Sequence, residues 1–222
     1  MPRVTTRVGR SRAPRAKPAA AQLPMPAVLY NATARPEAVT VPARTVLALD
    51  GQGAPEGERF QHSVGAIYGI AYTLKFARKK SGRKDFKIGP LEARWWTDEP
   101  ARRFMDTPRA SWRWQLRIGM PKDATPAEVS RAVADATHKK GGKLEGSAEA
   151  QQVALAVLPA ERCGRVLHIG PYAREGESFA KIVEVVQDAG LVARNSHLEV
   201  YLSDPRRTKP EKLKTELLLE LS

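Results

Sequence analysis

The amino-acid sequence predicts an α+β fold built from two similar halves, each with the order strand, strand, helix, strand, strand. Two observations predict it: a ten-residue segment recurs far along the chain, and an amphipathic helix pattern follows each copy. The chain has 222 residues, of which 42% are hydrophobic and 27% charged, which is enough to bury one sizeable core. We therefore expect one domain with pseudo-twofold symmetry.

The first 35 residues are predicted to be a disordered basic tail, before a domain that spans residues 36–222. They hold seven Lys or Arg residues and no acid, and the stretch up to residue 26 is rich in Arg, Pro and Ala. Such a composition buries too little apolar surface to offset its ordering entropy. The tail supplies more than half of the net charge of +13, so the high pI does not by itself indicate a nucleic-acid-binding fold. Contact of the tail with nucleic acid or anionic lipid, a transit peptide, and a solvated tail without specific function all stay open.

The repeat relates Gly51–Phe60 (GQGAPEGERF) to Gly170–Phe179 (GPYAREGESF) at a constant offset of 119 residues, with six identities in ten. An apolar segment precedes each copy, over residues 39–49 with a turn at 42–44 and over 153–169 with a turn at 159–162. We predict that each of these segments forms a β-hairpin.

Each copy of the repeat leads into a helix with one buried stripe at positions i, i+3, i+4 and i+7. The stripe residues are Phe60, Ser63, Val64 and Ile67 in the first helix, and Phe179, Ile182, Val183 and Val186 in the second. Gly190 is predicted to end the second helix. Strands are predicted over 93–97 and up to residue 203, and the last strand of each half over 112–118 and 215–221.

A connecting helix is predicted between the halves, over about residues 125–140. Thr125-Pro126-Ala127-Glu128 forms a capping box with Pro at the first helical position, and Gly141-Gly142 mark the end. The first half then spans about 37–121 and the second about 150–222.

Several classes of protein are excluded by what the sequence lacks. The single cysteine, Cys163, cannot form an internal disulfide, which indicates a cytoplasmic protein. No apolar run approaches the roughly 18 residues of a membrane span, so no membrane association is expected. The four histidines show no metal-ligand spacing, and phosphate-binding loops and nucleophile elbows are also missing. We expect neither a metal nor a cofactor, and no covalent intermediate.

A polar group of side chains is predicted near the end of the second half. Alternate residues of a strand share a face, so His197, Glu199 and Tyr201 project together, opposite Leu198 and Val200. A base, a carboxylate and a phenol side by side suit proton transfer or the holding of a cation. The alternative is a solvent-facing strand with ordinary polar side chains.

Aromatic residues concentrate in the first half. All four tryptophans, Trp95, Trp96, Trp112 and Trp114, fall on two successive predicted strands, and Tyr68, Tyr72 and Phe76 form a second stripe on the first helix. Tyrosines lining an aromatic cleft would suit flat or cationic organic molecules. Core packing for two of the tryptophans, and packing between the halves for the tyrosines, are the alternatives.

Five segments carry a family resemblance. They are residues 65–75 (GAIYGIAYTLK), 90–96 (PLEARWW), 112–114 (WRW), 168–172 (HIGPY) and 197–207 (HLEVYLSDPRR). In them the chain resembles the GyrI-like small-molecule-binding superfamily, in particular the branch related to cyclopropanoid hydrolases, which protect cells from DNA-alkylating spirocyclopropane natural products. The resemblance runs from about residue 37 to 221 and leaves the tail out.

This resemblance implies a SOUL/GyrI-like effector-binding fold with duplicated SHS2-type halves and a ligand cleft between them. It implies Glu199 as the base or water-orienting group and Tyr201 and Tyr68 as hydrogen-bond donors. The aromatic slot would comprise Trp95, Trp96, Trp112, Trp114 and Tyr72, with His168, Tyr172 and His197 as further ligand-binding residues.

Two functions follow from the resemblance. The first is a cofactor-free hydrolase that detoxifies strained electrophilic compounds and so confers resistance. The second is a non-catalytic module that sequesters planar or cationic molecules, or an effector-binding or inhibitor protein that acts on a partner protein. Arg94 departs from the small or apolar residue expected at its position; if it faced the cleft, it would neutralise Glu199 and favour binding over catalysis.

Overall fold

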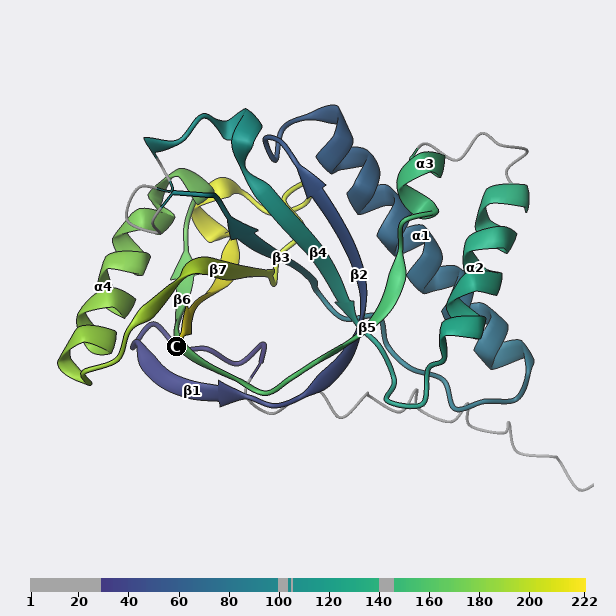
Figure 1. Cartoon of the computed structure of the whole chain (residues 1–222), viewed down its shortest axis with the longest axis horizontal. Coiled ribbons are helices and arrows are strands. Elements are labelled where there is room, and N and C mark those ends of the chain that lie inside the picture. The colour runs from purple at the N-terminus through teal and green to yellow at the C-terminus, as the bar shows by residue number, and fades with distance from the viewer. Residues whose placement is uncertain (1–28, 100–103, 105, 140–145) are drawn as a thin grey trace, which may run out of the picture.

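The computed structural model describes residues 29–99, 104, 106–139 and 146–222. The strands are β1 (Glu37–Val41), β2 (Arg44–Gln52), β3 (Leu91–Trp96), β4 (Arg113–Gly119), β5 (Ala154–Leu158), β6 (Glu161–Ile169), β7 (Ala193–Tyr201) and β8 (Lys214–Leu221). The helices are α1 (Glu58–Lys80), α2 (Pro126–Lys139), α3 (Ser147–Ala150) and α4 (Glu175–Asp188), with 3₁₀ turns η2 (Arg109–Ser111), η3 (Tyr172–Arg174) and η4 (Pro210–Lys212). The predicted α+β class is confirmed (Figure 1).

All eight strands form one antiparallel sheet in the order β1-β6-β8-β7-β3-β4-β2-β5. Read outward from the central β3–β7 pair, the order is β4, β2, β5 on one side and β8, β6, β1 on the other. Equivalent strands of the two predicted halves therefore occupy equivalent places in the sheet.

The two predicted hairpins are wrong. β1 pairs with β6 and β5 pairs with β2, so the halves exchange their first strands. The reason lies in the connections, Pro42-Ala43 and Pro159-Ala160, because a two-residue hairpin turn needs positive φ angles that Pro and Ala do not adopt. The chain instead runs on from one end of the strand order to the other, and the sheet curls so that its edges approach each other (Figure 1).

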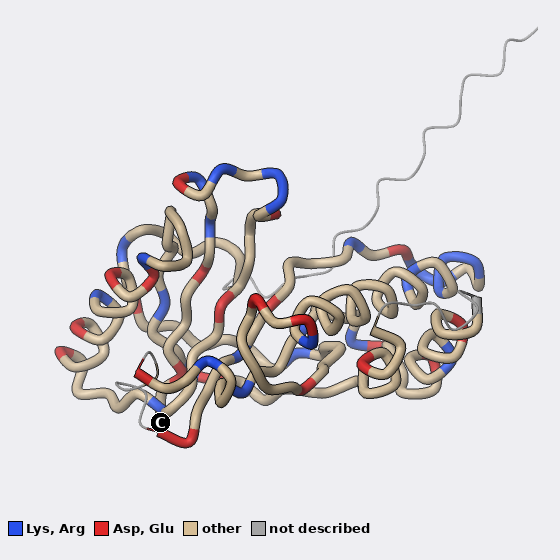
Figure 2. The backbone as a smooth tube through the Cα atoms, turned by 90° about the horizontal axis from the view of Figure 1, so that it is seen from above, with Lys and Arg blue, Asp and Glu red and all other residues tan. Residues whose placement is uncertain are grey.

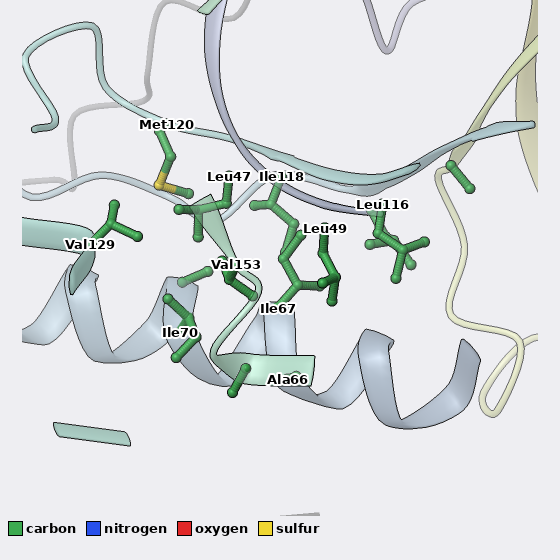
Figure 3. Close-up of a cluster of buried hydrophobic side chains, with 14 of the residues drawn as sticks. Leu47, Leu49, Ala66, Ile67, Ile70, Leu116, Ile118, Met120, Val129 and Val153 are labelled. Carbon is green, nitrogen blue, oxygen red and sulfur yellow. The ribbon is translucent and has the colours of Figure 1, made fainter. Parts of the chain in front are cut away.

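Both long helices of the repeat pack on one face of the sheet, which we call the helix face. A row of side chains crosses this face from strand to strand: Leu49, Leu116, Ala93, Glu199, Leu217 and Val166. Ile67 and Ile70 of α1 point toward Leu47, Leu49 and Ile118 (Figure 3). Ile182 and Val186 of α4 pack with Leu217 and Val166 at the other end of the row. Glu199 therefore lies between the two areas that the helices cover.

Local helix signals are confirmed with small differences. Thr125 donates its backbone N–H to Glu128 Oε2 at 2.9 Å, and Glu128 donates its own to Thr125 Oγ1 at 3.3 Å, so the capping box forms. Gly190 ends α4 with a φ of 65°. Val183, predicted on the buried stripe of α4, is exposed because the helix contacts the sheet through a narrower stripe around Ile182 and Val186. Gly141-Gly142 lie outside the described residues.

The opposite face, inside the curl, holds a buried network of charges and the first described residues. Leu29 is 3% exposed, and Tyr30 donates its N–H to Glu216 at 2.6 Å and its hydroxyl to Glu92 at 2.7 Å. Arg44 makes two hydrogen bonds to Glu92, at 2.6 and 2.7 Å. Although the predicted tail runs to residue 35, the chain from Leu29 onward is thus part of the domain; residues 1–28 lie outside the described part.

Lys and Arg positions and Asp and Glu positions both occur throughout the described backbone (Figure 2). Among residues 29–99, 104, 106–139 and 146–222, none of the helices combines the length and apolar character that a membrane span requires.

Candidate functional site

The strand β7 places three polar side chains together on the helix face, and we call them the β7 strip: His197, Glu199 and Tyr201. Tyr201 donates its hydroxyl to Glu199 Oε2 at 2.7 Å, and His197 Nε2 lies 3.2 Å from Glu199 Oε1. The intervening Leu198 and Val200 are buried inside the curl. The side chains of His197 and Glu199 remain 13% and 14% exposed, so the strip is enclosed but reaches solvent.

Aromatic rings from both halves enclose His197. The rings of Phe104 and Phe179 each lie 4.8 Å from the imidazole, in edge-to-face contact. Phe104 also contacts Trp112 at 4.4 Å, and Trp112 lies 5.9 Å from Trp95, the residue that pairs with His197 across the β3–β7 ladder. Trp95, Trp112 and Phe104 therefore form an aromatic wall beside the strip.

Tyr172 and Glu175 approach the strip from the other side, where η3 leads into α4. The ring of Tyr172 makes an edge-to-face contact with that of Tyr201 at 5.9 Å. Burial, with the nearby Glu175 and Glu199 carboxyls, raises the pKa of Tyr172 to about 12. Burial and Glu199 also raise the pKa of Tyr201 well above its usual value. Both phenols therefore keep their protons at neutral pH and can donate hydrogen bonds.

Glu175 is a buried acid beside the strip, only 7% exposed. Burial, reinforced by the negative charge of Glu199, raises the pKa of Glu175 from 4.5 to about 9. The nearby hydroxyl of Thr215 opposes this shift and so lowers the pKa. Thr215 Oγ1 and Glu175 Oε1 are both buried, and neither makes a close hydrogen bond. Glu175 is therefore protonated at neutral pH, whereas Glu199 accepts hydrogen bonds.

Unpaired polar atoms gather around the strip. Besides Glu175 Oε1 and Thr215 Oγ1, the indole Nε1 of Trp95 is buried without a hydrogen-bond partner. Trp95 lies across from His197 on β3, and Thr215 across from Tyr201 on β8. Buried polar atoms without partners are rare, because each lowers the free energy of unfolding by about 1–3 kcal/mol. A ligand that hydrogen-bonds to them would explain their presence.

Of the tyrosines on α1, Tyr68 lies at the border of the site and Tyr72 lies further from it. Tyr68 is partly buried beside the backbone of Leu91, whose partner across the ladder is Tyr201, and burial raises its pKa. Its ring centre lies 6.5 Å from that of Tyr72, which is 47% exposed. Tyr68 therefore edges the strip, and Tyr72 lies one turn further out.

Three residues of the expected site lie elsewhere. Trp96 projects to the opposite face, since its neighbour Trp95 is on the helix face, and there it contacts Arg94. Trp114 is fully buried against Phe60. His168 is buried, with its ring nitrogens 2.9 Å from Ser178 Oγ and 3.2 Å from the carbonyl of Pro171, so it fixes the turn before α4. Of the four tryptophans, Trp95 and Trp112 thus lie beside the β7 strip.

Arg94 does not neutralise Glu199. It projects inside the curl and pairs with Glu220 at 2.8 Å. Arg94 therefore differs from the family pattern because it belongs to the charge network inside the curl. It leaves the charge of the β7 strip unchanged.

Sequence reasoning missed Glu175 and Phe104. Glu175 was visible as a repeat identity with Glu56, but the Glu56 side chain is 60% exposed and pairs with Arg109, so the shared identity says nothing about burial. Phe104 lies between β3 and β4, outside any periodic pattern, and nothing in the sequence indicated that its ring reaches His197.

Comparisons with known proteins agree with this architecture. Residues 122–222 match the model of a GyrI-like small molecule binding domain. An uncharacterized conserved protein from Listeria innocua is 32% identical, with 87% of this chain and 95% of that chain covered and a TM-score of 0.78. A hydrolase from Listeria innocua is 31% identical, with 87% and 94% covered and a TM-score of 0.74.

A more distant structure shares the fold alone. The C-terminal domain of EcmrR is 12% identical, with 84% of this chain and 96% of that domain covered and a TM-score of 0.53. No curated protein shows significant sequence similarity to the chain. The domain match over the second half, together with relatives above 30% identity that align over nearly the whole domain, shows that this chain belongs to the GyrI-like small-molecule-binding family.

Proposed function

We propose that the protein binds flat, hydrophobic or cationic small molecules at the β7 strip and hydrolyses strained electrophilic ones, such as cyclopropanoid DNA-alkylating natural products. Such an activity would detoxify these compounds and confer resistance. The observation that carries the proposal is the Glu199–Tyr201 pair, held between aromatic rings and surrounded by buried polar atoms without partners. The similarity to a hydrolase from Listeria innocua supports it.

The proposed reaction is the hydrolysis of a cyclopropane that is spiro-fused to a cyclohexadienone. The oxygen of a water molecule bonds to the cyclopropane methylene carbon, and the bond from that carbon to the spiro carbon breaks. The released electron pair makes the ring aromatic and places the negative charge on the former carbonyl oxygen. One proton leaves the water and one proton reaches that oxygen, so the products are an alcohol and a phenol.

The residues of the strip suit the first half of this step. Glu199 is positioned to accept the proton of the water, and His197, fixed between two aromatic rings, orients its carboxylate. Trp95 and Trp112 would form an apolar wall beside the flat substrate, and Tyr68 would offer a hydroxyl at the edge. Tyr201 already donates its hydrogen to Glu199, so we assign it to positioning Glu199 rather than to the phenolate.

A second candidate is a module that binds without catalysis, as a sequestering protein or as an effector-binding or inhibitor protein for a partner. The family match favours it, because that match describes small-molecule binding alone. Hydrolase and binding module would use the same site, so only turnover separates them.

We also place the protein in the cytoplasm. Burial raises the pKa of Cys163 to about 12, so its thiol stays protonated and unreactive. A fold of this kind gains nothing from an oxidising compartment.

Incubation with a spirocyclopropane cyclohexadienone, followed by mass spectrometry and tryptophan-fluorescence titration, tests the proposal. Wild-type protein should open the ring, and Glu199→Gln should slow turnover by about 100-fold or more while binding stays within a few-fold. Glu177→Gln is the matched control, since Glu177 is exposed and pairs only with Arg174 among the contacts described. Binding without turnover would favour the second candidate, and absence of binding would refute both.

A further inference from the structure

The proposed reaction leaves one role without a residue: the donor of the proton that converts the developing phenolate into a phenol. Tyr201 is committed to Glu199, and Tyr68 lies at the edge of the strip. Arg94 does not supply a cationic donor to the strip either, because it points to the opposite face, where it pairs with Glu220.

Glu175 has the properties that this role requires. Its carboxyl is buried near Thr215, which pairs with Tyr201 across the β7–β8 ladder. Glu199 and Tyr201 of β7 and Tyr172 of η3, whose ring contacts that of Tyr201, are titratable groups that interact with it. On β6, His168 is bound to Ser178 of α4. On its own helix, Glu177 is turned to solvent and paired with Arg174 at 2.9 Å. The negative charge of Glu199 therefore opposes a second negative charge on Glu175.

One oxygen of this carboxyl, Oε1, is buried without a hydrogen-bond partner. A ligand oxygen that pairs with this carboxyl would remove the cost of that buried, unpartnered atom. Tyr172, three residues before Glu175, is 40% exposed, and its ring contacts that of Tyr201, so this side of the site borders solvent.

We propose that Glu175 is the general acid of the site and Glu199 its general base, so that the two carboxyls work as a pair. This inference rests on the proposed hydrolysis. Glu199 takes the proton from water as the oxygen attacks carbon, and Glu175 gives its proton to the former carbonyl oxygen as the carbon–carbon bond breaks. After product release, the proton on Glu199 returns to Glu175 through Tyr201 or solvent, which restores both carboxyls.

The kinetic test compares wild type, Glu175→Gln and Glu177→Gln over pH 5 to 10 with the spirocyclopropane dienone. Wild-type kcat should fall on the alkaline side, where Glu175 loses its proton. Glu175→Gln keeps the shape and a hydrogen-bond donor but cannot transfer a proton, so kcat should fall by about 100-fold and the alkaline decline should vanish, with KM within about threefold. Glu177→Gln should behave as wild type. An unchanged kcat, or a lower kcat with the same alkaline decline, would overturn the proposal.

A second measurement does not depend on turnover. Carboxyl-carbon NMR of the free protein, with selectively labelled glutamate, should show one glutamic acid that is protonated at pH 7, is missing from Glu175→Gln and persists in Glu177→Gln. A carboxyl that is ionised at pH 7 refutes the assignment of Glu175 even if the wild type is a good hydrolase. A protonated Glu175 in a protein without turnover at any pH refutes the hydrolase instead.

Discussion

Burial of Glu175 makes the stability of the fold depend on pH. Its pKa is about 9 in the folded chain and 4.5 when exposed, so between these values the folded state binds more protons than the unfolded state. Its contribution to the free energy of unfolding is therefore greatest below about pH 4.5 and is lost as the pH rises towards and through 9. Glu175→Gln removes this dependence.

We predict that the urea midpoint of Glu175→Gln rises relative to that of wild type as the pH increases from 5 to 9. Glu199→Gln should weaken the pH dependence, because the charge of Glu199 helps to raise the pKa of Glu175. Parallel midpoint curves for wild type and Glu175→Gln would show that the buried carboxyl does not titrate in this range. Glu177→Gln is again the control, as Glu177 is exposed.

Gly51 shows how a single missing side chain makes room for a buried ring. A Cβ at this position would lie 2.0 Å from Cη2 of Trp114, which is fully buried. Gly51→Ala must displace that ring, and we expect a loss of about 1–3 kcal/mol or more in urea unfolding. Gly65→Ala is the control: no atom lies within 4 Å of a Cβ there, and Ala in the middle of α1 should stabilise by up to about 1 kcal/mol. Equal effects of the two variants would contradict the close approach.

The junction of α1 and α2 depends on one carboxyl with two functions. Glu128 closes the capping box with Thr125, and it also binds Arg78 of α1 at 2.9 Å. Arg78 is 3% exposed and pairs with Asp123 as well, so its charge is buried between the two helices. Removal of a partner from a buried charge lowers the free energy of unfolding more than the loss of a helix cap does.

We expect Thr125→Ala to lower the free energy of unfolding by about 1 kcal/mol, as the loss of a helix cap does. Glu128→Gln retains the cap, because Gln also fits a capping box, but removes half of the negative charge around Arg78. It should therefore cost more than Thr125→Ala. Chemical denaturation followed by circular dichroism measures both, and the reverse order would mean that Asp123 alone satisfies Arg78.

Individual helices and their ends could be predicted from the sequence, whereas the pairing of the strands could not. The stripe of Phe60 and Ile67, the capping box at Thr125 and the glycine stop at Gly190 depend on residues within one or two turns, so their spacing carries the signal. Strand pairing depends on residues more than 100 positions apart, such as Val39 with Cys163. Nothing in the local pattern of an apolar strand distinguishes its neighbour in sequence from a strand of the other half.

The same distinction holds for the candidate site. A period of two predicted that His197, Glu199 and Tyr201 share a face, and it predicted that Trp95 and Trp96 do not. The arrival of Glu175 beside Glu199 depends on how α4 lies over β8, which only the assembled fold determines. Residues contributed by one strand could be named from the sequence, and those contributed by a second element could not.

At the scale of the whole molecule, the exchange of β1 and β5 ties the halves into one cooperative unit. β6 in the second half loses its outer neighbour if β1 is removed, and β2 in the first half loses its neighbour without β5. The inner network adds contacts across the curl, since Tyr30 bonds both Glu92 of β3 and Glu216 of β8. We therefore expect neither half to unfold while the other remains folded.

The distribution of tryptophan makes this cooperativity measurable. All four tryptophans lie between residues 95 and 114, so their fluorescence reports on the first half, whereas far-UV circular dichroism reports on both. The two urea curves should coincide in wild type. Val41→Ala, in β1 and packed against Leu198 and Val200 of the second half, should shift both curves to lower urea by the same amount, because the loss of buried methyl groups destabilises the single unit. A dichroism curve that shifts while the fluorescence curve stays in place would show instead that the halves unfold independently and that the exchanged strands do not couple them.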